Sequence, residues 1–265
     1  MTRHLWSLEG QLARVQLAGL AATIDCSRPA SGLDQVCVDG EPMLGACLLA
    51  FESAWESLGE VVPAADRCCR GAELMVGGAR GPDRPAGIDA RWRALPPEGA
   101  GGGDLGAIEL ILSVWTELWE VRPDLTVRSR LPAAEVLRLV DVDSVDVDSV
   151  DGDSGWLDAW PSADGAACEA GVEAGIDCLL FRLDGGRLSY AEMVHPADCQ
   201  GSDLVVTGRS PPAVEVRHRL RVGRLEKGVL LRTRVRGAFL RREGDARRAA
   251  ALYAALAAAD PPLEA

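Results

Sequence analysis

Residues 188–199, LSYAEMVHPADC, place four side chains capable of proton transfer close together: Tyr190, Glu192, His195 and Asp198. The whole chain has only three histidines and two tyrosines, so this concentration requires an explanation. Imidazole titrates near neutral pH and can exchange a proton with a carboxylate. His195 is therefore a candidate general acid, and Glu192 is a candidate base.

The strand expected over residues 187–194 limits this chemistry. Side chains alternate between the two faces of a strand, so Tyr190 and Glu192 share one face, and His195 leaves the strand at the next proline. His195 pairs with Glu192 only if a bulge intervenes; otherwise its partner is Asp198 or a carboxylate of another strand. A turn in which Asp198 accepts backbone hydrogen bonds and His195 is half exposed explains the same residues without catalysis.

A second candidate surface is the expected strand 107–119. One face is apolar and must point into a core: Ile108, Leu110, Leu112, Val114 and Leu118. The other face carries Trp115, Glu117 and Trp119. Indole rings stack on the apolar side of a sugar, and carboxylates accept hydrogen bonds from its hydroxyls, so this pattern favours a carbohydrate ligand. The alternative is the half-buried outer surface of a two-layer sandwich, where tryptophan is common.

Six arginines are expected on one face of a hairpin over residues 213–240, with its turn near 226–228. In the simplest register the opposed pairs are Arg217 with Arg236, Arg219 with Arg234, and Arg221 with Arg232. Like charges directly opposite each other destabilise a sheet. The face must therefore be solvated, neutralised by the protein's own carboxylates, or neutralised by an anionic ligand such as a uronate or a sulfated glycan.

Other polar residues are interpreted as structural. The same register places His218 among valines and leucines, which predicts a core histidine with a hydrogen-bonded ring. The eight cysteines form no CxxC pair and have no histidines spaced for zinc, so no metal site is expected. Four of them lie in apolar strand-like runs and are expected to be small buried hydrophobes: Cys26, Cys37, Cys47 and Cys178.

Short strand-like segments recur along the chain between clusters of Gly, Pro, Asp and Ser, a rhythm typical of antiparallel β proteins. The one good helix is expected over 245–259, with Asp245 as N-cap and prolines beyond its end. Its few large apolar residues allow it to cover a sheet but not to form a second core. We predict a mainly β fold, a large antiparallel β-sandwich with one C-terminal helix, in a single domain over 1–265.

Two segments interrupt this domain. PPEGAGGGD at 96–104 has the composition of a flexible loop. VDVDSVDVDSVDGDS at 140–154 is an acidic low-complexity insertion, and it is either a solvated segment or a calcium site. The spacing of its aspartates matches neither an EF-hand nor a glycine-rich calcium repeat, so the solvated segment is favoured.

Charge and motifs exclude several function classes. With 40 acidic and 28 basic residues the net charge is −12, which argues against nucleic acid and anionic membranes as partners. No signal-peptide core and no run of about 20 apolar residues is present, so a cytoplasmic location is expected. The motifs of serine hydrolases, NTPases, dehydrogenases and zinc proteases are absent, and no cofactor is expected. Nothing in the sequence indicates the oligomeric state.

The chain resembles the galactose-mutarotase-type β-supersandwich. The resemblance is carried by the opening LARVQLAGLAATIDCSRPASGLDQVCVDGEPML, the tryptophan-bearing strand with carboxylates, and strand-borne His195. It implies a large twisted sandwich of the kind found in aldose epimerases and in domains of polysaccharide-processing enzymes, where epimerases use a glutamate base and histidine acids on the concave sheet. RLSYAEMVHPAD and LEKGVLLRTRVRGAFL are also similar to segments of uncharacterised bacterial proteins.

Two hypotheses follow from these patterns. The first is a non-catalytic carbohydrate-binding or structural β-sandwich, whose ligand is a sugar with or without negative charge. The residues assigned to the ligand are Trp115, Glu117, Trp119, Tyr190, Arg219 and Arg234. The alternative is a sugar-active enzyme of aldose-epimerase or polysaccharide-lyase type, with His195 as general acid, Glu192 or Glu117 as base, and arginine holding a substrate carboxylate.

Overall fold

The computed structural model describes residues 4–53, 64–78, 86–97, 104–140, 155–160, 176–207 and 213–260. Most of the expected loop at 96–104 and nearly all of the acidic insertion at 140–154 lie outside these residues. Calcium binding by the insertion therefore stays a hypothesis. The described chain is mainly β, as predicted, with antiparallel pairing between neighbouring strands.

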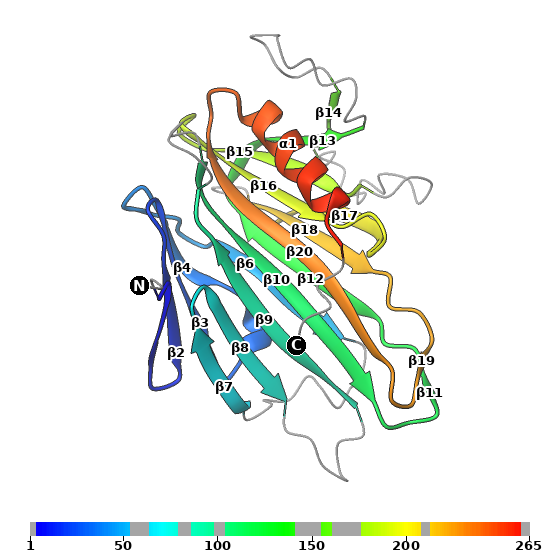
Figure 1. Cartoon of the computed structure of the whole chain (residues 1–265). Coiled ribbons are helices and arrows are strands. Elements are labelled where there is room, and N and C mark those ends of the chain that lie inside the picture. The colour runs from blue at the N-terminus through cyan, green and yellow to red at the C-terminus, as the bar shows by residue number, and fades with distance from the viewer. Residues whose placement is uncertain are drawn as a thin grey trace.

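A nine-stranded sheet forms the largest layer (Figure 1). In spatial order its strands are β14 (Trp156–Asp158), β13 (Ala133–Leu139), β15 (Cys178–Leu183), β16 (Leu188–Val194), β20 (Leu230–Arg241), β10 (Asp104–Thr116), β9 (Ala86–Leu95), β8 (Glu73–Gly78) and β7 (Ala64–Arg70). β7 and β8 form a hairpin, because Gly71 between them adopts the left-handed conformation that a tight turn requires.

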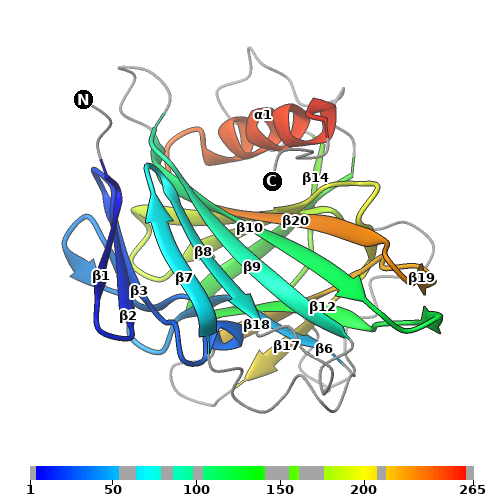
Figure 2. The ribbon, with the colours of Figure 1, turned by 60° about the horizontal axis from the view of Figure 1, so that its bottom comes forward.

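Two smaller sheets pack against the nine-stranded sheet. The four-stranded sheet has the order β17 (Cys199–Thr207), β18 (Ala213–Leu220), β12 (Leu125–Leu131) and β6 (Cys47–Ser53). The five-stranded meander consists of β1 (Trp6–Glu9), β2 (Leu12–Gln16), β3 (Leu20–Asp25), β4 (Asp34–Val38) and β5 (Glu41–Pro42), with a short 3-10 helix, Pro29–Ser31, after β3. Figure 2 shows the four-stranded sheet on one side of the large sheet and the helix α1 (Asp245–Ala258) on the other.

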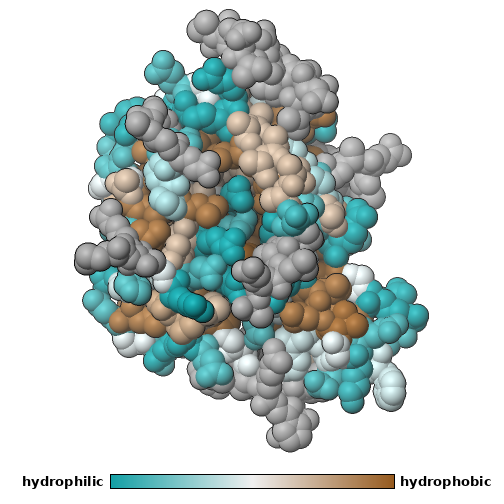
Figure 3. All heavy atoms as spheres, viewed as in Figure 1, coloured by the Kyte–Doolittle hydropathy of each residue, from teal (hydrophilic) through white to brown (hydrophobic). Residues whose placement is uncertain are grey.

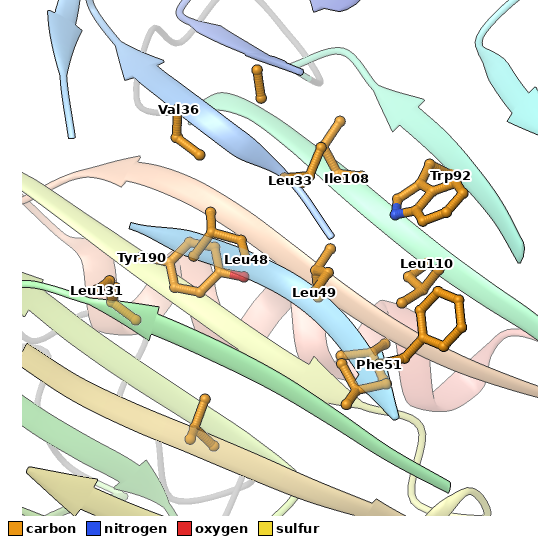
Figure 4. Packing of buried hydrophobic residues seen from close by; sticks show 14 of the residues in the cluster. Leu33, Val36, Leu48, Leu49, Phe51, Trp92, Ile108, Leu110, Leu131 and Tyr190 are labelled. Atoms are coloured by element: carbon orange, nitrogen blue, oxygen red, sulfur yellow. The ribbon is translucent and has the colours of Figure 1, made fainter. Parts of the chain in front are cut away.

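One apolar cluster runs between these layers (Figure 4). The face of β10 expected to be apolar is buried from Ile108 to Val114, but Leu118, expected on the same face, lies beyond the end of the strand and is 42% exposed. Phe51 of β6 meets Trp92 of β9 across the sandwich, with ring centroids 6.4 Å apart. The alternation of residues along β10 thus sets the core face of the large sheet, as the sequence predicted.

The helix α1 covers part of the outer face of the large sheet, confirming the expected helix and its covering role. A second apolar cluster joins the helix to the strands: Leu137, Trp156, Cys178, Leu180, Ala191, Met193, Leu240, Ala246, Ala249, Ala250 and Leu256. Small alanines let the helix approach the sheet closely. Among the described residues, no helix combines the length and the apolar character needed to cross a membrane.

Asp245 is not the N-cap that the sequence predicted. Gly244 holds that position in a left-handed conformation, φ 64°. The Asp245 carboxylate is buried under the first turn, where it lies 3.2 Å from Arg182 Nε and accepts a hydrogen bond of 2.6 Å from Ser189 Oγ. The ion pair of Asp245 with Arg182 on the sheet therefore replaces the predicted capping interaction. This ion pair fixes the start of the helix on the sheet.

The predicted hairpin over 213–240 is also wrong. β18 pairs with β12 and β17, whereas β20 pairs with β10 and β16, so the two arginine-bearing strands belong to different sheets. The connection between them carries β19 (Leu225–Glu226), which pairs with β11 (Glu120–Val121). Separation into two sheets removes the direct opposition of like charges that the hairpin would have required.

We expect Asp245→Ala to lower the free energy of unfolding by about 3 kcal/mol, because Arg182 and Ser189 lose a buried partner. Urea denaturation followed by circular dichroism measures this change. The exposed Glu243→Ala variant, two residues earlier in the chain, is the matched control and should change stability by less than about 0.5 kcal/mol. Equal stabilities of the two variants would contradict the role of Asp245 in helix docking.

Candidate functional site

Tyr190 and Glu192 lie in the core, within a buried polar chain formed by Tyr190, Glu192, His218 and Ser202. Tyr190 Oη donates to Glu192 Oε2 over 2.5 Å. His218 Nε2 lies 3.1 Å from Glu192 Oε1, close enough for an ion pair although the atoms are not aligned as a hydrogen bond. His218 Nδ1 is 2.7 Å from Ser202 Oγ, which donates to the carbonyl of Ile176 over 2.8 Å. The chain links β16 of the large sheet to β17 and β18 of the four-stranded sheet.

The donors and acceptors fix the direction of one hydrogen bond. Ser202 uses its hydroxyl proton on Ile176, so His218 Nδ1 donates to Ser202 Oγ. Glu192 and His218 lie beside each other where water does not reach, so each has the other as its partner in the core.

The residues around Tyr190 leave space for its phenol group in this buried polar chain of four side chains. Burial is the main cause that raises the pKa of Tyr190 well above its usual value, and the neighbouring Glu192 adds to it. Gly237 of β20 is opposite Glu192, and a Cβ at Gly237 would lie only 2.2 Å from Tyr190 Oη. The absence of a side chain at Gly237 therefore leaves the space that the phenol occupies.

This burial decides the roles of three predicted residues. Glu192 and His218 are fully buried, so no substrate reaches them. His218 is a core histidine with a hydrogen-bonded ring, as predicted. Glu192 is buried in the core, whereas His195 lies beyond the end of β16 and is partly exposed, so the two do not form an acid–base pair. Tyr190 likewise has no surface to offer a ligand.

His195 lies in a turn at the end of β16. Its ring is partly exposed, and Nδ1 accepts a hydrogen bond of 3.2 Å from the backbone of Ala197. Asp198 Oδ2 accepts the backbone N–H of Arg234 over 3.0 Å, while burial raises the pKa of the Asp198 carboxyl. Burial raises the pKa of the Cys199 thiol to about 12, so Cys199 is not a thiolate nucleophile near neutral pH. This is the turn geometry that the sequence allowed as an alternative to catalysis.

The two tryptophans do not share a surface. Trp115 is 6% exposed and packs against Gly87, where an added Cβ would lie 2.6 Å from the indole ring. Trp119 is 87% exposed and lies beyond the end of β10, so the predicted strand to residue 119 is too long. The strand stops because Thr116 begins a turn, with its hydroxyl accepting the N–H of Leu118 over 3.0 Å. Exposed Glu117 lies in that turn.

The arginines are neutralised largely by carboxylates of the chain. On the outer face of the large sheet, Glu73, Arg93, Glu109 and Arg236 form a row of alternating charge across four strands. The nitrogen–oxygen distances along this row are 2.9, 3.6 and 2.9 Å. Arg219, on the four-stranded sheet, lies 3.4 Å from Asp203. These contacts are the internal neutralisation that the sequence offered as one of three alternatives.

Buried Arg234 has a structural partner: its guanidinium donates to the carbonyl of Ala259 over 2.8 Å, just past the end of α1. Arg234 thereby fixes the end of the helix to the sheet. Arg219 and Arg234 lie in different sheets and do not form a common surface.

A cleft of about 800 Å³ lies beside the charge row, over β7 to β10 and the start of β20. Its polar lining residues are Asp66, Arg67, Asp89, Arg91, Ser113 and Arg232, and Met75 and Leu230 add apolar surface. Figure 3 views this outer face, on which hydrophilic side chains run between hydrophobic patches. The cleft combines cations, hydrogen-bond acceptors and apolar atoms, the mixture found in sites for small polar ligands.

Strand register builds the floor of the cleft. Ser113 of β10 lies between Asp89 of β9 and Arg232 of β20, and Arg232 Nε donates to Ser113 Oγ over 3.3 Å. One row further, Arg91 is opposite Met75, and its guanidinium is 3.8 Å from Glu73. Of the residues that the sequence analysis predicted, Arg232 lines this cleft, and the other polar lining residues were missed. The alternation in GIDARWRAL, with Asp89 and Arg91 opposite in face to buried Trp92, was the available signal.

No metal site was found in the described part of the chain, where no three His, Cys, Asp or Glu side chains are grouped to hold an ion. The described cysteines are free. Cys26 and Cys178 are buried as expected, whereas Cys37 and Cys47 are only partly buried.

Several solved structures are similar to this chain at low identity. An aldose epimerase homologue from C. elegans is 11% identical with a TM-score of 0.47, over 91% of this chain and 99% of that chain. A proposed aldose 1-epimerase from Klebsiella pneumoniae is 9% identical with a TM-score of 0.41, over 98% of this chain and 90% of that chain. An α-N-acetylgalactosaminidase from Bifidobacterium bifidum is 14% identical with a TM-score of 0.43, over 86% of this chain and 36% of that chain.

No protein-family model and no curated protein matches the chain. At these identities and TM-scores the likeness assigns no ligand and no residue role, so function has to be inferred from the chain's own side chains.

We expect His218→Leu to lower the free energy of unfolding by about 3 to 5 kcal/mol, because Glu192 is left buried without its partner. The double variant Glu192→Met/His218→Leu replaces both partners by apolar groups and should recover most of the loss. Urea titration measures both values, with exposed Glu52→Gln as control. Equal losses in the single and double variants would show that the pair does not couple the two residues.

A pH dependence is expected at Asp177, whose carboxylate accepts a hydrogen bond of 3.2 Å from Tyr253. Burial is the main cause that raises the pKa of Asp177. A raised folded pKa means that the stability from this group is full below its unfolded pKa, about 3.9, and is lost as pH rises through the folded pKa. Asp177→Asn should therefore gain stability relative to the native chain between pH 4 and pH 7.

Thermal denaturation across that pH range measures the difference between the Asp177→Asn variant and the native chain. Exposed Asp184→Asn controls for the loss of one negative charge. A difference that falls with rising pH would contradict the raised pKa of Asp177.

Proposed function

We propose that the protein binds an acidic saccharide in the outer cleft and performs no chemistry on it. The observation that carries the proposal is the pair Arg91 and Arg232, which flank the polar floor of an 800 Å³ cleft from neighbouring rows of the sheet. Guanidinium groups bind carboxylates and sulfates through charge-assisted hydrogen bonds. A uronate or a sulfated sugar supplies such a group.

The other lining residues favour a sugar over a simple anion. Asp66 and Asp89 supply acceptors for hydroxyl groups, while Met75 and Leu230 supply apolar surface for the carbon face of a ring. The volume lies in the range of about 300–1,000 Å³ that is typical of small-molecule sites. A small inorganic anion would leave most of this surface without a contact.

In the described part of the chain, the predicted pair of Glu192 and His195 does not form, which supports binding without catalysis. Glu192 is buried in the core, and His195 lies in a partly exposed turn. A sugar-active enzyme with His195 as general acid remains the second candidate because of one observation. The backbone N–H of His195 donates to the carbonyl of Arg234, two residues from Arg232 of the cleft.

Isothermal titration calorimetry with glucuronate and with sulfated monosaccharides tests the binding proposal. We expect Arg91→Gln and Arg232→Gln each to weaken binding of the acidic sugar at least tenfold, since each removes a charge-assisted hydrogen bond of about 1.5–3 kcal/mol. Added salt should weaken binding by the native chain. Neutral glucose should bind more weakly than glucuronate.

The matched control is Arg219→Gln, which removes an exposed arginine from the four-stranded sheet and should leave binding unchanged. Affinities of the Arg91 and Arg232 variants equal to that of the native chain would contradict the proposal. Epimerisation or elimination of the bound sugar that disappears in His195→Gln would favour the enzyme instead.

A further inference from the structure

An exposed apolar surface adjoins the outer cleft where β10 ends and β20 begins. We call it the tryptophan tip; it consists of Leu118, Trp119, Val229 and Leu230. Trp119 is the most exposed large apolar side chain of the described residues, at 87%. The other three are 40 to 43% exposed. Grouped apolar side chains left in water at one end of a molecule are typical of a contact surface.

Hydrogen bonds and an ion pair fix the backbone beneath the tryptophan tip. The strands β11 and β19 pair just behind it, Glu120 opposite Glu226 and Val121 opposite Leu225, and Arg224 forms an ion pair with Glu120. The N–H of Gly228 donates to the carbonyl of Thr116 over 3.1 Å. Trp119 thus lies in an ordered turn. A ligand that stacks on Trp119 therefore binds with little loss of backbone conformational entropy.

The tip and the cleft form a continuous surface. Leu230 belongs to the tip and also lines the cleft, and it is opposite Trp115 on β10. Ser113 on the cleft floor and Trp119 are six residues apart, so their Cα atoms are at most about 20 Å apart. A ligand of several linked sugars can therefore reach both places.

The charges differ between the two places. Arg91 and Arg232 border the cleft, whereas the exposed carboxylates Glu117 and Glu120 flank Trp119, and Glu120 is already paired with Arg224. Carboxylates accept hydrogen bonds from sugar hydroxyls but repel a second carboxylate at short range. The neighbouring cation is taken by Glu120 and Glu117 adds a negative charge, so the indole surface suits a neutral sugar ring.

We propose that the tryptophan tip is a second subsite for the ligand of the cleft, and that this ligand is an oligosaccharide of mixed charge. An acidic sugar lies between Arg91 and Arg232, and a neutral sugar of the same chain stacks on Trp119. This inference rests on the proposed binding of acidic sugars in the cleft. It adds the length of the ligand and the order of charged and neutral units along it.

Calorimetry with three probes tests this inference: glucuronate, a hexasaccharide of alternating glucuronate and N-acetylglucosamine, and hexagalacturonate. The native chain should bind the alternating hexasaccharide more tightly than glucuronate. Trp119→Ala should weaken binding of that hexasaccharide about 3- to 10-fold, the range of one aromatic contact, and leave glucuronate binding unchanged. Trp119→Phe should restore part of the loss, and hexagalacturonate should bind more weakly than the alternating hexasaccharide.

The control variant is Leu44→Ala, which removes an exposed apolar side chain outside the tip and should change no affinity. Glucuronate binding without a gain from the alternating hexasaccharide, or a hexasaccharide affinity unchanged in Trp119→Ala, would overturn the second subsite and leave the cleft proposal intact. Failure of the native chain to bind any of the three probes would overturn both.

Discussion

The contact between His218 and Glu192 is the constraint around which the two layers of the sandwich are arranged. It is a pairing of ionisable groups in an otherwise apolar core, so each neighbour must satisfy an atom that water cannot reach. Tyr190 and Ser202 supply these hydrogen bonds from opposite sheets. Apolar contacts between Leu and Val side chains tolerate small shifts of one layer against the other. The polar contacts from Tyr190 to Ser202 depend on distance and direction, so they set the position of β16 relative to β17 and β18.

The outer face of the large sheet follows a different rule. Its charged side chains are arranged so that opposite signs alternate across the strands, as in the row from Glu73 to Arg236. Away from this row the helix α1 covers the apolar side of the face, held by Asp245 at its start and by Arg234 near its end. The cleft lies beside the charge row on this face, over β7 to β10 and the start of β20.

Local pattern in the sequence was enough to predict the elements but not their partners. Alternation gave the core face of β10, and the alanine run between Asp245 and the final prolines gave α1 nearly to the residue. The pairing of β18 with β12 rather than β20 depends on contacts across most of the chain, which no local period encodes. His218 could be predicted as a core residue, but its partner Glu192 could not, because the two lie on strands of different sheets. Trp119 was misplaced because the turn at Thr116 depends on a side-chain hydrogen bond.

The strand β16 shows why the residues that first suggest catalysis do not form an active site. Glu192 is buried in the core, whereas His195 lies beyond the last residue of the strand in a partly exposed turn, so closeness in sequence does not make them a pair. Glu192 is needed inside as the partner of His218. Alternation on β9 and β20 places Arg91 and Arg232 on the outer face, in neighbouring rows on either side of β10. Strand pairing, rather than closeness in sequence, therefore decides which polar side chains come together in this fold.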